Sequence, residues 1–146
     1  MEQRVNIEQT QPEAWKALYG LAIILSKSTL SPIQKHLIMV RASQINSCAF
    51  CINMHTKEAL KTSETQQRLF LLSAWKETNL FTDEEKAILA LTEEVTLIHQ
   101  NGVSDATYKQ AEKFFSAETI GEIIMLIVLM NAWNRIAIST HLPLGE

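Results

Sequence analysis

The sequence predicts an all-α fold, a single-domain helical bundle of six or seven helices. Only four glycines and three prolines occur in 146 residues, and the prolines stand near the expected ends of helices. Helix-start signatures, in which a serine or threonine precedes a glutamate or glutamine by three residues, recur along the chain. The alternating apolar pattern of strands is missing. We expect one domain over residues 1–146, because this length suits a single core.

The predicted helices are marked by recognisable starts and ends. Residues 10–13 and 31–34 each combine an N-cap, a proline in the first turn and a glutamate or glutamine that completes a capping box. Residues 82–85 form another capping box, and Asn46 and Ser47 interrupt the second helix. The expected helices cover about residues 10–28, 31–45, 48–62, 63–76, 82–101, 105–115 and 117–139.

The last predicted helix is the most apolar part of the chain. It is apolar on most sides between Ile120 and Met130, which is typical of a central core helix or of a helix in an obligate interface. Both interpretations remain open at the level of sequence. The most apolar run, residues 123–130, is shorter than the roughly 20 residues that cross a bilayer, so we expect no membrane partner.

The net charge and the N-terminal residues indicate which partners and which compartment to expect. The net charge is −3, and no basic patch supports binding to nucleic acid. No apolar run typical of a signal peptide follows residues 1–5. We therefore expect a cytoplasmic protein, and in that compartment a C-x-x-C pair is more often catalytic or metal-binding than a structural cross-link.

The chemistry-bearing segment is Cys48-Ala-Phe-Cys51-Ile-Asn-Met-His55, which contains both cysteines of the chain. If a helix begins at Cys48, a rotation of about 100° per residue puts Cys51 about 60° and His55 about 20° from Cys48 around the axis. All three side chains then share one face, and Cys51 and His55 are neighbours at i,i+4. Helix N-termini favour thiolates, and a second thiol within reach converts a sulfenic acid to a disulfide. The spacing therefore predicts thiol redox chemistry.

Two other interpretations of this segment remain open. Two buried cysteines and a core histidine can be purely structural. A zinc site is the sharper alternative, because Cys48, Cys51 and His55 supply three of the four usual ligands. His36 or an acidic residue would be the fourth, although the chain has no second C-x-x-C and no H-x-x-x-H.

The segment from Leu37 to Lys57, in which R-A-S-Q-I-N leads directly into C-A-F-C-x-x-x-H, resembles the core of the alkyl hydroperoxidase D-like (AhpD-like) proteins. These belong to the carboxymuconolactone decarboxylase superfamily. Residues 64–78 and 131–137 are also similar, so the resemblance covers about residues 10–140. It implies an all-helical, obligate homo-oligomer, commonly a trimer or a hexamer.

The resemblance also implies an activity and assigns roles. It implies a thiol-dependent peroxidase of peroxiredoxin type that reduces alkyl hydroperoxides in antioxidant defence. Cys51 matches the peroxidatic cysteine, Cys48 matches the cysteine that resolves or donates a proton, and His55 matches a histidine of the proton relay. Electrons would come from an external dithiol, either a lipoyl group or a thioredoxin-like protein or small thiol. No metal or other cofactor is expected beyond the redox-active disulfide. From helix-terminus chemistry alone, Cys48 would be the more acidic thiol, so the order of attack stays open.

The chain departs from the family pattern at two positions. The relay glutamate that the family usually has twelve residues before the first cysteine is replaced by His36. The histidine that some members have just before the second cysteine is replaced by Phe50. A histidine can hydrogen-bond but does not supply the negative charge of a carboxylate. We expect His36 still to take part, in a relay that is rewired or weakened.

Two further activities remain as alternatives. A redox sensor or thiol–disulfide adaptor would form the disulfide but show negligible peroxide turnover. Lactone decarboxylation, the other activity in the superfamily, does not need a cysteine pair, so the pair argues against it.

Four polar residues outside the segment of residues 48–55 have expected structural roles. Arg41 is expected to form an ion pair with a carboxylate rather than to activate a thiol. Asn131 and Asn134, on either side of Trp133, are expected to tie helix ends together inside an oligomer. Glu122 needs a partner in an apolar helix, and we expect Arg135 or a neighbouring subunit to provide it.

Overall fold

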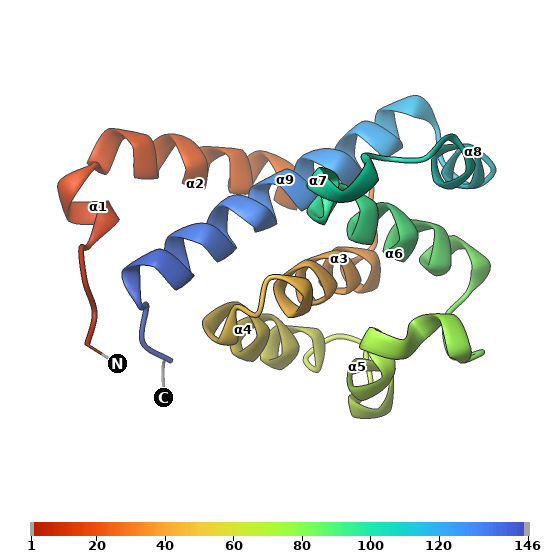
Figure 1. Ribbon diagram of the computed structural model, residues 1–146, viewed down its shortest axis with the longest axis horizontal. Coiled ribbons are helices and arrows are strands. Elements are labelled where there is room, and N and C mark those ends of the chain that lie inside the picture. Colours follow the sequence, from red (N-terminus) through yellow and green to blue (C-terminus); the bar gives the residue numbers. More distant parts are fainter. Residues whose placement is uncertain (1, 145–146) are drawn as a thin grey trace.

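The computed structural model describes residues 2–144 and confirms the all-α class over that range, with no strand (Figure 1). The described part has nine α-helices and one 3₁₀ helix, more than the six or seven expected. They are α1 (Ile7–Thr10), α2 (Pro12–Ser26), α3 (Pro32–Ile45), α4 (Ala49–Ala59), α5 (Gln66–Leu71), η1 (Leu72–Glu77), α6 (Asp83–Thr96), α7 (Ile98–Asn101), α8 (Asp105–Glu112) and α9 (Ala117–Thr140). The single-domain span of residues 1–146 stays a prediction.

The extra helices come from local features that periodicity does not reveal. The side chain of Asn6 accepts a hydrogen bond from Gln9 N–H and starts the four-residue α1. The helix expected at residues 63–76 divides into α5 and η1, and Ala74 within η1 has non-helical dihedral angles. Leu97, with φ −96° and ψ 35°, separates α6 from α7. Each division interrupts the backbone without changing the apolar pattern.

Two of the three predicted capping boxes are confirmed, and one is wrong. Ser31 with Gln34, and Thr82 with Glu85, make both reciprocal hydrogen bonds of the motif. The predicted box at residues 10–13 does not form, because Gln11 is the N-cap of α2 and makes no side-chain cap. Thr10 is the last residue of α1 and donates from its hydroxyl to Asn6 O, so it is not the N-cap of α2 as expected.

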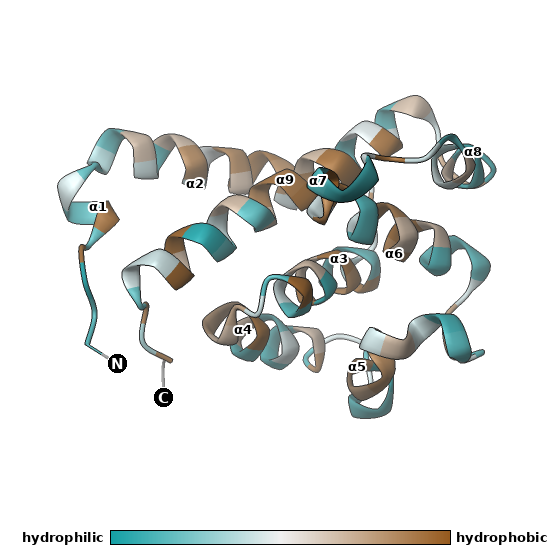
Figure 2. Cartoon of the chain, viewed as in Figure 1, coloured by the Kyte–Doolittle hydropathy of each residue, from teal (hydrophilic) through white to brown (hydrophobic). Residues whose placement is uncertain are grey.

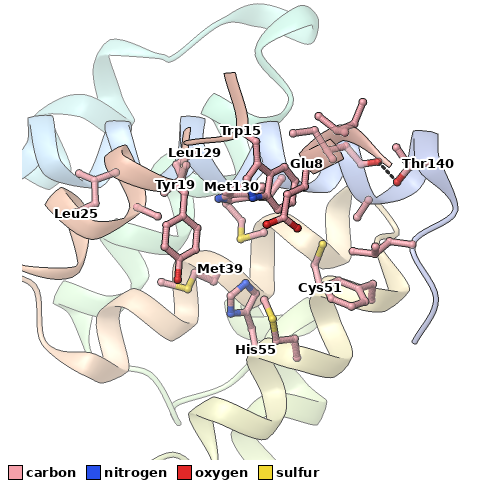
Figure 3. Close-up of a pocket in the computed structure, with 18 of the residues that line it drawn as sticks. Glu8, Trp15, Tyr19, Leu25, Met39, Cys51, His55, Leu129, Met130 and Thr140 are labelled. Atoms are coloured by element: carbon pink, nitrogen blue, oxygen red, sulfur yellow. Dashed lines mark hydrogen bonds between the residues drawn. The ribbon is translucent and has the colours of Figure 1, made fainter. Parts of the chain in front are cut away.

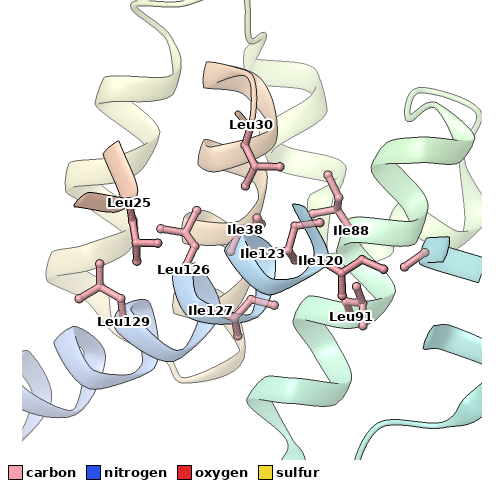
Figure 4. Close-up of a cluster of buried hydrophobic side chains, with 11 residues drawn as sticks. Leu25, Leu30, Ile38, Ile88, Leu91, Ile120, Ile123, Leu126, Ile127 and Leu129 are labelled. Carbon is pink, nitrogen blue, oxygen red and sulfur yellow. The ribbon is translucent and has the colours of Figure 1, made fainter. Parts of the chain in front are cut away.

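The core is built around α9, which runs diagonally across the molecule beside α2, α3 and α6 (Figure 1). Ile120, Ile123 and Ile127 of α9 are buried against Ile38 of α3 and Ile88 of α6 (Figure 4). Full burial of such a side chain contributes about 1.5–3 kcal/mol to stability. In Figure 2 the hydrophobic residues concentrate along α2 and α9 and between α3 and α6. The core-helix interpretation of α9 is therefore confirmed.

The same helix is longer than its most apolar run suggested. By length and composition alone, the 24 residues of α9 suffice to cross a membrane. However, 44% of its most apolar 18-residue stretch is buried inside the fold, where it packs on α3 and α6. A core helix meets the same criteria of length and composition. Exposed apolar side chains on its other side include Met125, Val128 and Ile138.

Candidate redox site

The cysteine pair is positioned by a tight turn between α3 and α4. Ser47 adopts the left-handed conformation, with φ 57°, which non-glycine residues seldom adopt. Cys48 N–H then donates to Ser43 O at 3.0 Å, and α4 begins at the next residue. The predicted interruption at Asn46 and Ser47 and the placement of C-x-x-C at a helix N-terminus are both confirmed.

Cys48 and Cys51 form a disulfide, with their Cα atoms 5.3 Å apart. Cys48 is the N-cap of α4, and its Sγ accepts a hydrogen bond from Cys51 N–H at 3.3 Å. The exposed fractions of the two residues are 1% and 2%. The two cysteines are therefore buried to the same extent, but of the two only Cys51 lines the neighbouring cavity.

The cavity next to Cys51 has a volume of about 680 Å³ and lies between α2, α4 and α9. Its walls are mainly apolar, and Trp15 of α2 meets Trp133 of α9 edge-on with ring centroids 4.9 Å apart. Figure 3 shows Cys51 and His55 on the side formed by α4, with Trp15 and Met130 facing them. Such an apolar cavity with few polar groups is typical of a small-molecule site.

His55 lies one turn after Cys51 on α4 and lines the same cavity. Its Nδ1 lies 3.1 Å from Oε2 of Glu58, and the exposed fractions of the two side chains are 10% and 47%. Burial lowers the pKa of His55 below its ordinary value of 6.5, while the charge of Glu58 and its hydrogen bond oppose this effect. His55 is therefore a neutral imidazole near pH 7, able to accept a proton.

His36 of α3 lies beside this pair. Ligand-type atoms of His36, His55 and Glu58 all lie within 4.8 Å of one another. Nδ1 of His36 is buried and has no hydrogen-bond partner among residues 2–144. Burial lowers the pKa of His36, against the charges of Glu58 and Glu64. The structure thus brings all four predicted site residues, Cys48, Cys51, His55 and His36, into one region.

The alternative zinc site would use Cys48 and Cys51 as ligands. The two sulfurs are bonded to each other, and a metal-binding cysteine is a free thiolate. The metal-type donors that do converge are His36, His55 and Glu58. Two imidazoles and one carboxylate suit a transition metal, although here the carboxylate already accepts a hydrogen bond from one of the imidazoles.

Glu58 is the site residue that the sequence argument missed. Its position three residues after His55, on the same face of a helix, was a usable signal. Nothing in the sequence indicated that Trp15 and Trp133 meet across the cavity, because they are far apart along the chain and belong to different helices.

The other polar positions have structural roles in the described chain. Arg41 forms the predicted ion pair, with Glu93 at 2.8 Å. Asn46, at the end of α3, donates to Oδ1 of Asn131 and of Asn134, at 3.0 and 2.9 Å, so the asparagines connect α3 to α9 within one chain, and a tie inside an oligomer stays a prediction. The prediction that Arg135 pairs with Glu122 was wrong. Thr29 instead donates to the Glu122 carboxylate from both its backbone N–H and its hydroxyl.

The sequence of the chain matches the profile of the Carboxymuconolactone decarboxylase family over residues 11–94. It is 38% identical over 139 residues to the uncharacterized protein YdfG of Bacillus subtilis, with 95% of each chain covered. It is 26% identical over 117 residues to the uncharacterized protein YnjA of Escherichia coli, covering 80% of this chain and 64% of YnjA.

Structural comparison gives the same relationship. A protein of unknown function from Agrobacterium tumefaciens, described as a candidate antioxidant defence protein AhpD, superposes with a TM-score of 0.95 and 36% identity over 99% of both chains. The AhpD-like fold predicted from the sequence is confirmed by this match. With 58% of its length matched by the family profile and a relative of 38% identity matched over 95% of both chains, the chain belongs to the carboxymuconolactone decarboxylase family.

Proposed function

We propose that this protein is a thiol-dependent peroxidase that reduces alkyl hydroperoxides through Cys48 and Cys51. Membership in a family with AhpD-like antioxidant members and the presence of a disulfide-forming pair support peroxidase-like activity in general. The observation that carries the finer proposal is that Cys51 and His55 line one apolar cavity, one helical turn apart.

In the first step, the Cys51 thiolate attacks the terminal oxygen of the hydroperoxide. The O–O bond breaks as the S–O bond forms, so sulfur is oxidised to a sulfenic acid and the peroxide is reduced to an alkoxide. His55 takes the thiol proton before attack and returns it to the alkoxide, which leaves as an alcohol. His36, close to His55, assists this transfer.

In the second step, Cys48 condenses with the Cys51 sulfenic acid. The S–S bond forms and water leaves. The position of Cys48 supports a resolving role, because its sulfur is within bonding reach of Cys51 and does not line the cavity. An external dithiol, a lipoyl group or a thioredoxin-like protein, then reduces the disulfide by thiol exchange. No metal or other cofactor takes part.

We also propose that the protein acts in the cytoplasm as a homo-oligomer, a trimer or a hexamer. Exposed apolar residues on α2 and α9, among them Ile23, Ile24 and Val128, support an association between copies. Light scattering of the purified protein measures the oligomer directly.

The test is dithiol-dependent consumption of an organic hydroperoxide by wild type, Cys51→Ser and Cys48→Ser. Turnover in wild type that is lost in Cys51→Ser is the expected result. A disulfide that forms without turnover in wild type would instead favour a redox sensor or thiol–disulfide adaptor. That second candidate is favoured by one observation: both cysteines are almost fully buried. Release of carbon dioxide from carboxymuconolactone would identify a decarboxylase.

A further inference from the structure

We infer that Glu58 orients His55 and tunes its charge, and that through this pair the buried thiol site exchanges protons with solvent. The inference deepens the proposed function, because it rests on the assignment of His55 to proton transfer. It makes Glu58 a positioning residue, acting on the reaction through the imidazole.

The hydrogen bond fixes one form of the imidazole. A carboxylate only accepts hydrogen bonds, so the contact at 3.1 Å places the hydrogen of neutral His55 on Nδ1. Nε2 then keeps a free lone pair and is the atom that accepts a proton. Cys51 lies four residues earlier on α4, the spacing at which helix side chains are neighbours. Glu58 thus selects the tautomer that the reaction needs.

Burial differs sharply between the two partners. The exposed fraction of the His55 side chain is 10%, whereas that of Glu58 is 47%. Both residues line the cavity. A proton that leaves the imidazole through Nδ1 therefore passes to a carboxylate that is already in contact with water.

Helix stability does not explain the position of Glu58. It lies in the last turn of α4, which ends at Ala59. Unpaired carbonyl groups make this end of a helix negative, so an acidic side chain there is unfavourable. The hydrogen bond to His55 is the contact that offsets this cost.

No other carboxylate near the two histidines has the same arrangement. Glu64 acts on His36 by its charge, but its side chain is fully buried and accepts hydrogen bonds from Arg68 and from Thr65 N–H. Glu8 of α1 lines the cavity and is exposed. Only Glu58, among the described residues, forms a hydrogen bond with a histidine of this cluster.

The charged groups around His55 come from two helices. Glu58 on α4 favours the imidazolium, and His36 on α3 opposes it. Lys35 and Glu64 act on His36 with opposite signs. Neutralising Glu58 therefore removes the main favourable charge, and the imidazolium that pairs with the Cys51 thiolate is destabilised.

The test compares Glu58→Gln with wild type in the reduced Cys48→Ser background, where Cys51 is the remaining thiol. Glutamine keeps the shape and a hydrogen-bond acceptor but removes the charge. Alkylation of Cys51 by iodoacetamide is followed against pH. We expect the profile to move up by about one pH unit, as loss of a neighbouring opposite charge does, with a roughly tenfold slower reaction at neutral pH. Glu58→Asp, which keeps the charge on a shorter side chain, should restore part of the shift.

The matched control is Glu112→Gln, on an exposed residue of α8 that does not line the cavity. This variant should alkylate as wild type does. A merely structural role for Glu58 would change the rate equally at every pH and leave the midpoint in place, which would overturn the inference.

A second measurement does not depend on the thiol. Long-range ¹H–¹⁵N NMR of the oxidised wild-type protein reports the tautomer of each of its four histidines. We expect the Nδ1–H form for His55 and a lower pKa for His55 in Glu58→Gln. An Nε2–H form, or one equivalent of bound metal in the purified protein, would overturn the assignment.

The two proposals can fail separately. If wild type shows no peroxide turnover but Glu58→Gln still shifts the alkylation profile, only the proposed function is rejected. If wild type turns over peroxide but Glu58→Gln does not shift the alkylation profile, only the role of Glu58 is rejected.

Discussion

Cys51 lines the cavity, while its disulfide partner Cys48 caps the helix that carries Cys51. The Sγ of Cys48 accepts the backbone N–H of Cys51 at 3.3 Å, so the two residues are coupled by a covalent bond and by a hydrogen bond. A molecule entering the cavity therefore meets Cys51. This asymmetry makes the two cysteines separable by experiment.

Substitution of Cys51 by serine should abolish the thiol-dependent reaction with hydroperoxide, because the cavity then holds no thiol. Substitution of Cys48 by serine should preserve the first oxidation but stop dithiol-dependent turnover, since no resolving thiol remains. Mass spectrometry after one equivalent of peroxide checks this, with a dimedone adduct on Cys51 expected in Cys48→Ser. An adduct on Cys48 in Cys51→Ser, formed at the wild-type rate, would reverse the two roles.

His36→Ala should slow turnover, because the proposed relay then lacks the imidazole that lies within 4.8 Å of His55 and Glu58 and assists proton transfer. It should also move the pH profile of turnover, because His36 opposes the charged form of His55. Removing it leaves the imidazolium of His55 easier to form. Steady-state rates between about pH 5 and 9 measure this, and His99→Ala, which replaces an exposed histidine of α7, is the control. A pH profile and a turnover identical to those of wild type would show that His36 has only a packing role.

The oxidised protein should lose stability in mild acid. Burial lowers the pKa values of His36 and His55 below 6.5 in the folded state. Between these folded values and 6.5 the unfolded chain binds more protons than the folded chain, so the free energy of unfolding falls as the pH drops through that window. Urea unfolding at several pH values measures this slope, and the double variant His36→Gln, His55→Gln should flatten it.

Asn46→Ala should destabilise the fold by about 1–3 kcal/mol, because it leaves the buried Oδ1 of Asn134 without the donor at 2.9 Å. Asn134 itself donates to Ser43 Oγ at 3.1 Å, so these amides form a polar connection between α3 and α9 beside their apolar contacts. Urea denaturation checks the value. The control is Asn101→Ala, on an exposed residue at the end of α7, which should unfold close to wild type.

Ile123→Ala should destabilise the core by about 2–5 kcal/mol, the usual cost of a cavity at a fully buried site. Val128, on the same helix, has an exposed fraction of 46%, and its substitution by alanine should cost far less in a monomer. Thermal unfolding of both variants makes the comparison. A large effect at Val128 would indicate that this face of α9 is buried between copies of the chain.

Much of the local structure followed from the sequence because its causes are local. The capping boxes at Ser31 and Thr82 and the break at Asn46 and Ser47 depend on hydrogen bonds within a few residues. Periodicity failed where a helix is divided without a change in apolar pattern, as at Leu97. The capping-box prediction failed at Thr10, because Thr10 is the last residue of α1 and is not the N-cap of α2.

The sequence by itself determined the helical class and the shared face of Cys51 and His55 on α4, because spacing along one helix fixes which side chains are neighbours. Its motif also indicated the carboxymuconolactone decarboxylase superfamily. Only the tertiary structure decided that Cys51 rather than Cys48 meets the cavity, and that Trp15 and Trp133 form its wall. Tertiary packing of α3 on α4 also brought His36 to the pair formed by His55 and Glu58. Trp15 and Trp133 lie on helices distant in sequence, whereas His36 and His55 lie on consecutive helices. In both cases the packing of apolar faces that brings the side chains together leaves no periodic signal in the residues themselves.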